Sequence, residues 1–198
     1  PTGQGYVTME QGEPKYKFLD DVAWDFLEWT DKLQQLAERC QAVTFGTLGQ
    51  RNEVARKTIQ QFVMKARQAL RVFDVNLRQQ FYSAEILRTC CDLATVVKLN
   101  EHELPEVHRL LGLPNIPPAL DGEVGVDRAA EDILAGFSLS ALALTRGRHG
   151  TVLYHSGQKS VGKPAEYPRG EHADSVGAGD ACTAGVIVGM LAQRSGQE

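Results

Sequence analysis

Short, continuous apolar runs recur along this chain, and longer segments with apolar side chains at helical spacing lie between them. Continuous runs of this kind are typical of strands that are covered on both faces. The predicted buried strands span residues 42–45, 71–75, 95–99 and 139–145. The predicted helices span residues 52–70, 83–90, 101–111 and 127–137. Antiparallel strands at a sheet edge are predicted over residues 151–154 and 158–167.

The first forty residues follow other patterns. Residues 6–10 and 15–19 flank a Gln-Gly-Glu-Pro turn, which predicts a β-hairpin of the kind that projects from a domain as a flap. Residues 20–38 predict a helix that breaks in its middle, where Thr30 or Asp31 can cap the second part.

The last apolar run, residues 181–192, follows a turn that contains Gly177 and Gly179. The run is apolar on all sides, which predicts a buried helix rather than a surface helix. Its positive end would lie at the glycine turn.

The alternation of strands and helices predicts an α/β fold with a mostly parallel sheet. In such folds, ligands bind at the carboxyl ends of the strands. The unusual polar clusters of this sequence follow the predicted strand ends, so we expect them to gather at one edge of the sheet.

Composition and charge narrow the classes of partner. The net charge is −4 at pH 7, and no basic block exceeds two residues, which argues against nucleic acid or an anionic membrane surface as a partner. No apolar run is long enough to span a bilayer, and the first residues do not resemble a signal peptide. The four cysteines form no CxxC pair, so we expect reduced thiols in a cytoplasmic protein.

The turn at Gly177, Ala178 and Gly179 carries almost no side chains, so backbone N–H groups can close around an oxyanion or phosphate at the helix start. Asp180 would stand at the mouth of this site, where a carboxylate could accept the proton of a hydroxyl that attacks a phosphoryl group. The alternative is a glycine turn followed by an aspartate that caps the helix.

Two clusters follow the first two buried strands. Thr47, in the glycine-containing turn after residues 42–45, could hydrogen-bond a ligand, although an ordinary strand-to-helix turn explains it equally well. Asp74, Asn76 and Arg78 alternate, so their side chains share one face in extended chain. Arg78 could bind a phosphate or carboxylate, or it could form a buried ion pair with Asp74 that steadies the loop.

Two more clusters follow the next two strands. Asn100 and Glu103 lie three residues apart at a helix start, where they could hold the waters of a hydrated Mg²⁺. The alternative is a capping box, with Asn100 as N-cap and Glu103 as its partner. Gly147 and Gly150 allow the backbone to approach a nucleotide closely, but a simple hairpin turn also fits.

These clusters, in this order, resemble the ribokinase-like (PfkB) family of carbohydrate kinases, most closely its fructokinase branch. Residues 174–181, DSVGAGDA, resemble the family's D-[ST]-x-G-A-G-D signature, and Asn100-x-x-Glu103 resembles its N-x-x-E motif. Residues 145–150 resemble its nucleotide loop, and residues 74–78 resemble the D-x-N-x-R segment of fructokinases and 2-keto-3-deoxygluconate kinases. The resemblance implies a three-layer α/β/α sandwich with a mostly parallel sheet and a small β-hairpin lid.

The resemblance also implies a role for each matching position. Asp180 would be the catalytic base, and the amides of Gly177, Ala178 and Gly179 would hold the transferring phosphoryl group. The implied ATP contacts come from residues at two strand ends and from the anion turn: Asn76, Thr145, Arg146, Gly147, Gly150, Gly177 and Gly179. Arg78, Thr47 and Asp180 would contact the sugar. Asn100 and Glu103 would organise Mg²⁺ through water, and the loop at Asp174 would hold a monovalent cation such as K⁺.

The chain departs from the family at its ends. Family members begin with strands that carry much of the sugar site, and they continue beyond the last helix seen here. We therefore expect residues 1–20 to be part of a lid and residues 21–198 to be an incomplete kinase core. Relatives dimerise through the lid hairpin, which predicts the same contact here. The predicted function is ATP-dependent phosphorylation of fructose or a related sugar. The alternatives are a 2-keto-3-deoxygluconate or other carbohydrate kinase, and a catalytically incomplete member that acts as a binding or assembly module.

Overall fold

A six-stranded sheet forms the centre of the computed structural model, which describes residues 2–10, 13–114, 122–164 and 176–195. The strands lie in the order β3-β4-β5-β6-β7-β8, so the sheet follows the chain. The first four strands are parallel, and β7 and β8 add to the edge in antiparallel pairing. The expected α/β fold with a mostly parallel sheet is confirmed.

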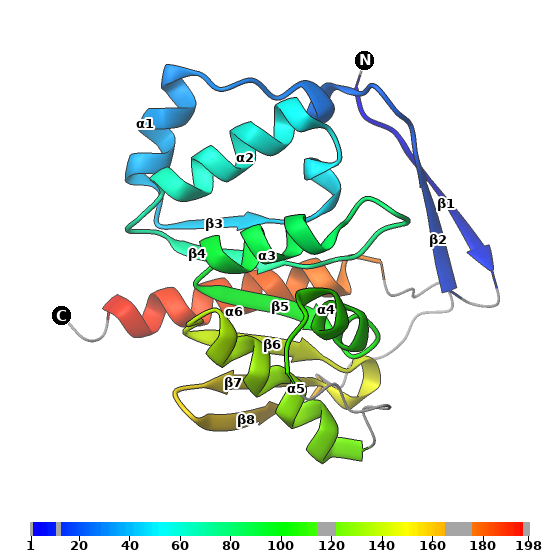
Figure 1. The fold of residues 1–198 in the computed structure, drawn as a ribbon, viewed down its shortest axis with the longest axis vertical. Helices are drawn as coiled ribbons and strands as arrows, with labels where there is room; N and C mark the ends of the chain where they lie inside the picture. Colours follow the sequence, from blue (N-terminus) through cyan, green and yellow to red (C-terminus); the bar gives the residue numbers. More distant parts are fainter. Residues whose placement is uncertain (1, 11–12, 115–121, 165–175, 196–198) are drawn as a thin grey trace.

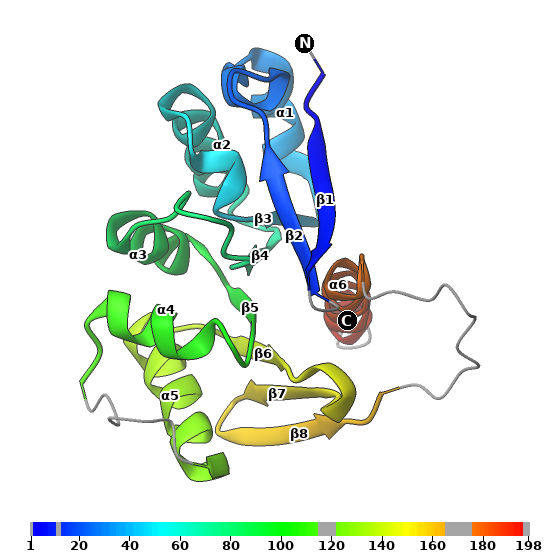
Figure 2. The ribbon, with the colours of Figure 1, turned by 90° about the vertical axis from the view of Figure 1, so that its right-hand side faces the viewer.

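The strands of this sheet are β3 (Ala42–Phe45), β4 (Leu70–Asp74), β5 (Val96–Asn100), β6 (Ala141–Thr145), β7 (Thr151–His155) and β8 (Gln158–Gly162). The α-helices are α1 (Asp31–Arg39), α2 (Glu53–Lys65), α3 (Ala84–Leu93), α4 (Leu104–Leu111), α5 (Gly122–Gly136) and α6 (Ala178–Ser195). Three short 3₁₀ helices are η1 (Ala23–Phe26), η2 (Leu48–Gln50) and η3 (Gly147–His149). Helices α2 to α5 cover one face of the sheet, and α6 crosses the other face (Figures 1 and 2).

Side-chain caps set the starts of three helices. Thr30 caps α1, Asn52 caps α2 and Ser83 caps α3, each by accepting a hydrogen bond from a backbone N–H in the first turn. These caps and the bounds of β3 agree with the sequence-based prediction.

The larger core lies between the sheet and helices α2 to α5. The strands β4, β5 and β6 contribute fully buried side chains to it, including Phe73, Leu99, Leu142 and Leu144, and helices α3 to α5 contribute others. On the opposite face, a smaller cluster of Leu70, Val72, Val96 and Ala141 lies under α6. The apolar runs of the strands are therefore continuous because both faces of the sheet are covered.

The hairpin of β1 (Gly5–Glu10) and β2 (Glu13–Phe18) forms a separate two-stranded sheet. It extends along the edge at which the parallel strands end (Figure 1). Tyr16 and Phe18 stack with their ring centroids 6.0 Å apart, and Phe18 meets the ring of Trp24 edge-on at 6.4 Å. Aromatic contacts thus join the hairpin to η1.

The prediction of a buried final helix was wrong. Thr183 is the only buried side chain in the described part of α6, and Val188 is 67% exposed. One side of α6 packs on the sheet, through Val186, Ile187, Met190 and Leu191. The described residues place nothing on its other side, so the apolar character all around the helix does not produce burial.

Other differences lie at element boundaries. The segment predicted as a helix over residues 20–38 contains only η1 and α1, separated by extended chain. Helix α4 begins at Leu104 rather than at residue 101, and α5 begins at Gly122 rather than at residue 127. None of the helices in the described ranges combines the length and apolar character needed to cross a membrane.

Candidate active site

The carboxyl ends of the parallel strands and the first turn of α6 meet at one edge of the sheet. In Figure 1, the strands point toward the end of the molecule at which α6 begins and along which the hairpin lies. The predicted clusters after β3, β4, β5 and β6 therefore share this edge.

The anion turn, defined here as Gly177, Ala178 and Gly179, opens helix α6. Gly177 has a φ of +81°, in the left-handed region that suits glycine, and its carbonyl accepts the N–H of Ala181 at 2.9 Å. Asp180 lies in the first helical turn with an exposed side chain. The amides of such a turn and the helix dipole favour an anion, next to an exposed carboxylate. Asp174, predicted to hold a monovalent cation, lies outside the described residues.

Asp74, at the end of β4, forms a buried ion pair with Lys98 of β5. The ammonium Nζ lies 3.1 Å from Oδ1 and 3.2 Å from Oδ2 of the carboxylate. The hydroxyl of Thr183 on α6 donates to Oδ2 at 2.7 Å. The alternative of an Asp74–Arg78 pair is therefore wrong, because Asp74 faces α6 and the partner comes from the next strand. Sequence reasoning missed Lys98 and Thr183, although each is a polar residue inside an apolar run.

The chain turns sharply after Asp74, so the expected alternation on one face does not continue. Asn76 has a φ of +40°, which takes the backbone out of extended geometry. The guanidinium of Arg78 then lies 4.6 Å from the ring centroid of Tyr16. The side-chain amide of Gln79 donates through Nε2 to the backbone carbonyl of Tyr16 at 3.0 Å. This loop is where the hairpin contacts the strand ends.

Glu103 joins the ends of β4 and β5. Its Oε1 accepts the backbone N–H of Leu77 at 2.8 Å, and its Oε2 accepts that of Asn100 at 2.9 Å. The side-chain oxygen of Asn100 in turn accepts the N–H groups of His102 and Glu103, both at 2.9 Å. Burial raises the pKa of Glu103, and the amide hydrogen bonds lower it only in part. These reciprocal bonds have the pattern of the capping box that was the alternative interpretation, but they close the turn of residues 100–103 ahead of α4, whose N-cap is Glu103.

Thr47 does not present a free hydroxyl at this edge. It is fully buried, and its Oγ1 lies 3.2 Å from the carbonyl of Val75 and 3.4 Å from that of Asn76. Just before it, a side chain at Gly46 would place Cβ 2.9 Å from the carbonyl of Asp74. The turn after β3 therefore packs directly on the end of β4.

The loop after β6 has a backbone that only glycine can adopt at one position. Gly150 has φ +86° and ψ −148°, and a Cβ there would lie 2.1 Å from the carbonyl oxygen of Gly162. The carbonyl of Gly150 accepts the N–H of Arg146 at 2.8 Å, which closes the loop. The hydroxyl of Thr145 donates to the carbonyl of Leu99 at 3.5 Å.

The side chain of Arg146 reaches toward acidic groups. Its Nη1 lies 3.3 Å from Oε1 of Glu123, and its Nε lies 3.9 Å from Oε2 of Glu101. Both carboxylates are partly exposed, so these pairs are weak and the guanidinium is free to change partners.

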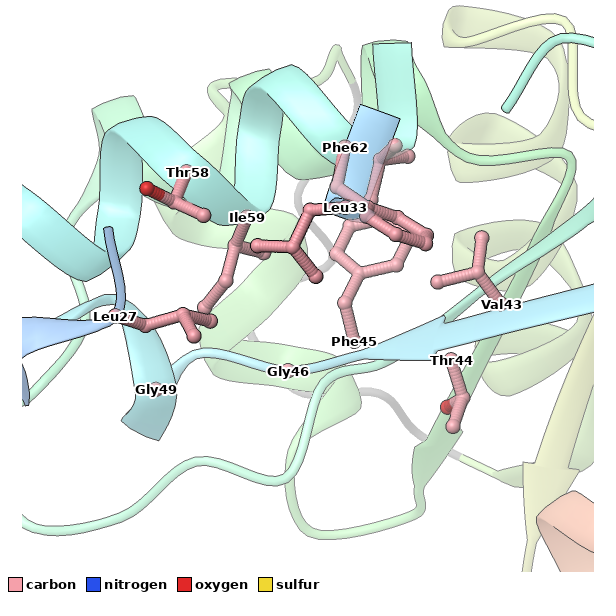
Figure 3. Close-up of a pocket in the computed structure, with 11 residues that line it drawn as sticks. Leu27, Leu33, Val43, Thr44, Phe45, Gly46, Gly49, Thr58, Ile59 and Phe62 are labelled. Atoms are coloured by element: carbon pink, nitrogen blue, oxygen red, sulfur yellow. The ribbon is translucent and has the colours of Figure 1, made fainter. Parts of the chain in front are cut away.

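The cavity drawn in Figure 3 lies beside β3, and its lining contains none of the charged side chains described above. It has a volume of about 170 Å³ and is lined by eleven residues from β3, the turn after β3, α1, α2 and the segment before α1. Leu33, Ile59 and Phe62 point into it, and no titratable side chain lines it. We therefore place the candidate site at the strand ends and not in this cavity.

Within the described ranges, no group of three or more His, Cys, Asp or Glu side chains is arranged to hold a metal ion. Mg²⁺ that is bound through its own waters and through substrate phosphates does not need such a group.

The chain also matches the model of a known protein family. Residues 13–198 match the model of the pfkB family of carbohydrate kinases. The chain is 27% identical over 197 residues to the sugar kinase PH1459 of Pyrococcus horikoshii, which is described as uncharacterized, and the match covers 96% of this chain and 56% of that protein.

Solved structures share the fold. The ATP complex of PH1459 superimposes with a TM-score of 0.71 at 24% identity, over 96% of this chain and 57% of that one. Fructokinase of Xylella fastidiosa with bound ATP gives 0.71 at 19% identity, over 94% and 55%. A nucleoside kinase of Burkholderia thailandensis in complex with inosine gives 0.68 at 19% identity, over 96% and 54%. The chain thus spans a little more than half the length of these relatives.

Proposed function

Because this chain belongs to the PfkB family of carbohydrate kinases, we propose that its protein transfers the γ-phosphoryl group of ATP to a hydroxyl group of a sugar. Fructose is the first candidate. The observation that carries the proposal is the position of the α6 start, which the Thr183–Asp74 hydrogen bond holds at the strand ends. An anion turn, an exposed carboxylate and the nucleotide-loop glycines then belong to one edge of the sheet.

Asp180 is the proposed base, and Gly177, Ala178 and Gly179 are the proposed anion hole. Phosphoryl transfer needs positioning and stabilisation of charge more than covalent chemistry by the protein. The exposed carboxylate of Asp180 can meet a sugar hydroxyl directly, while the amides of the turn would face the oxygens of the transferring phosphoryl group.

ATP would lie across the ends of β4 and β6. The proposed contacts come from the nucleotide loop, the loop after β4 and the anion turn: Asn76, Thr145, Arg146, Gly147, Gly150, Gly177 and Gly179. Arg146 would exchange its weak pairs with Glu101 and Glu123 for phosphate oxygens. A planar guanidinium suits that exchange, since it binds phosphate through two parallel hydrogen bonds.

Asn100 and Glu103 are the proposed partners of Mg²⁺, through water. Each carboxylate oxygen of Glu103 already accepts one amide, so a second lone pair on each remains for a water of the ion. The ion would supply neutralising charge to the phosphates. The proposed K⁺ site at Asp174 rests on the resemblance of the sequence motif alone.

The sugar would bind beside Arg78 and Asp180. Thr47 enters this proposal as a residue that supports the loop of Asn76, since its hydroxyl is used by backbone carbonyls. Arg78 is compatible with an acid sugar, so a 2-keto-3-deoxygluconate kinase is the second candidate. A cytoplasmic location and a homodimer formed through the β1–β2 hairpin complete the proposal.

Coupled ADP production tests the proposal. The full-length protein is assayed with fructose, 2-keto-3-deoxygluconate and ribose in the presence of ATP and Mg²⁺. We expect sugar-dependent ADP release with one of the three. If the rate of ADP release is the same without sugar as with each of the three sugars, the proposed kinase activity is contradicted.

The third candidate is a catalytically incomplete member that acts as a binding or assembly module. Calorimetric titration of the 198-residue chain with ATP tests whether these residues hold a nucleotide site. Binding of ATP that disappears with Arg146→Ala supports a nucleotide half-site within these residues. No heat of binding to the chain, with activity retained by the full-length protein, assigns the nucleotide site to the longer form.

A further inference from the structure

Three buried polar side chains connect α6 to the two central strands. Asp74, Lys98 and Thr183 are 9%, 7% and 5% exposed, and Lys98 is the only buried lysine in the described part of the chain. Their hydrogen bonds run from β5 through the end of β4 to the second turn of α6. A buried carboxylate requires such partners, because an unpaired buried charge is strongly unfavourable.

The apolar contacts of α6 lie toward its other end. Val186, Ile187, Met190 and Leu191 pack on the sheet, whereas the four residues of the first turn are exposed or half-buried. The start of the helix, which carries the anion turn, therefore has little apolar packing to hold it. Thr183 supplies the one buried anchor between these two parts of α6.

We infer that Asp74 acts as a latch that positions the anion turn, with Thr183 as its contact on α6 and Lys98 as its counter-ion. The carboxylate receives the Thr183 hydroxyl at 2.7 Å, and the same hydroxyl lies 3.1 Å from the carbonyl of Gly179, one helical turn earlier. The latch thus ends on the anion turn itself. These three are positioning residues, and their effect on catalysis rests on the proposed function.

Gly179 has a second constraint in this arrangement. A side chain there would place Cβ 3.1 Å from Nζ of Lys98, which Asp74 holds in place. A side chain at residue 179 would therefore push Nζ of Lys98 away by a few tenths of an ångström and disturb its pairing with Asp74. This reason for glycine is independent of any bound anion.

Hydrogen exchange tests the latch without any assay of activity. The amides of residues 180–184 are compared in the wild-type chain, in Thr183→Val, which keeps the shape and removes the hydroxyl, and in Thr183→Ser, which restores it. Thr58→Val is the matched control, since Thr58 is a buried threonine on α2. We expect Thr183→Val to raise exchange of these amides about tenfold or more, as loss of a hydrogen bond to a charged group implies. Thr183→Ser and Thr58→Val should leave it near the wild-type rate.

Unchanged exchange in Thr183→Val would overturn the latch. An equal increase throughout β3 to β6 would also overturn it, because a general loss of stability is not specific to the start of α6. Neither outcome depends on whether the protein is a kinase.

A kinetic measurement on the full-length protein then tests the link to catalysis. Thr183→Val should lower kcat about tenfold or more with little change in KM for the sugar, because a displaced anion turn weakens transition-state contacts. Thr183→Ser should restore kcat. If Thr183→Val and Thr183→Ser have the same kcat, the link to catalysis is refuted, even if the hydrogen exchange of residues 180–184 changes as expected.

Discussion

Arg51 and Asp25 form a buried two-point ion pair between the turn after β3 and the short helix η1. Nε of Arg51 donates to Oδ1 of Asp25 at 2.7 Å, and Nη2 donates to Oδ2 at 2.6 Å. The guanidinium also lies near the rings of Trp24 and Phe81, at 5.4 and 5.1 Å, and donates to the carbonyl of Leu19 at the base of the hairpin. One side chain thus ties the hairpin base to the edge of the candidate site.

Arg51→Met should therefore destabilise the protein by about 3 kcal/mol, because it leaves the carboxylate of Asp25 buried without its counter-charge. The guanidinium of Arg51 lowers the pKa of Asp25, which shows how strongly the pair favours the charged form. Urea unfolding measures the effect. Lys57→Met is the control: its pair with Glu53 is largely exposed, so it should change stability by less than about 0.5 kcal/mol. Equal effects of the two substitutions would refute the importance of the buried pair.

Glu103 should titrate above the ordinary range of a glutamate, because burial raises its pKa. A raised pKa in the folded state means that its contribution to stability is complete below the unfolded value of about 4.3 and is lost as the pH rises through the folded value. Carbon-detected NMR of the side-chain carboxyl groups measures the titration directly.

Glu106 on the same helix is the internal control for that titration. Its hydrogen bond with Arg109 lowers its pKa, so its carboxyl signal should move at a lower pH than that of Glu103. The reverse order would show that the carboxylate of Glu103 is not buried as described.

Gly150→Ala should destabilise the fold by about 3 kcal/mol, since the new Cβ would collide with the carbonyl of Gly162 in a backbone region open only to glycine. Gly157→Ala is the matched control in the neighbouring β7–β8 turn. Gly157 also has a positive φ, +71°, but a Cβ there would meet nothing within 4 Å, so the cost should be about 1 kcal/mol. Thermal or urea unfolding compares the two, and similar losses would rule out the collision.

Asp180→Asn should lower kcat of the full-length protein at least about a hundredfold, because a neutral amide cannot accept the proton of the sugar hydroxyl. Asp92→Asn, at an exposed position of α3, should leave kcat unchanged. Stopped or steady-state ADP release measures both. Near-normal turnover by Asp180→Asn would refute the role of base.

Sequence patterns predicted those features of the fold that depend only on neighbouring residues. The bounds of β3 and the caps Thr30, Asn52 and Ser83 were correct, because strand burial and helix capping depend on neighbours in sequence. The start of α5 at Gly122, five residues before the predicted start at residue 127, was missed, since glycine is unfavourable within a helix. Helix α6 was predicted as buried because its residues are apolar on every side, but burial also needs elements on both of its sides.

In the candidate site, too, the sequence predicted the short motifs but not the distant residues that they contact. The motifs around Asp180, Glu103 and Gly150 were visible in the sequence because each is a short run with its own spacing. Their partners were not visible. Glu103 is bonded by Leu77 of the loop after β4, and Gly150 lies against Gly162 of β8, so both partners come from other parts of the chain.

Short motifs and apolar periodicity were enough to predict the family, the order of the strands and helices, and the edge of the sheet at which the polar clusters gather. The pairing of Asp74 with Lys98 and Thr183, rather than with Arg78, could be seen only in the folded structure. That choice depends on which strand lies beside β4 and on where α6 crosses the sheet. No local pattern encodes a contact between residues 109 positions apart.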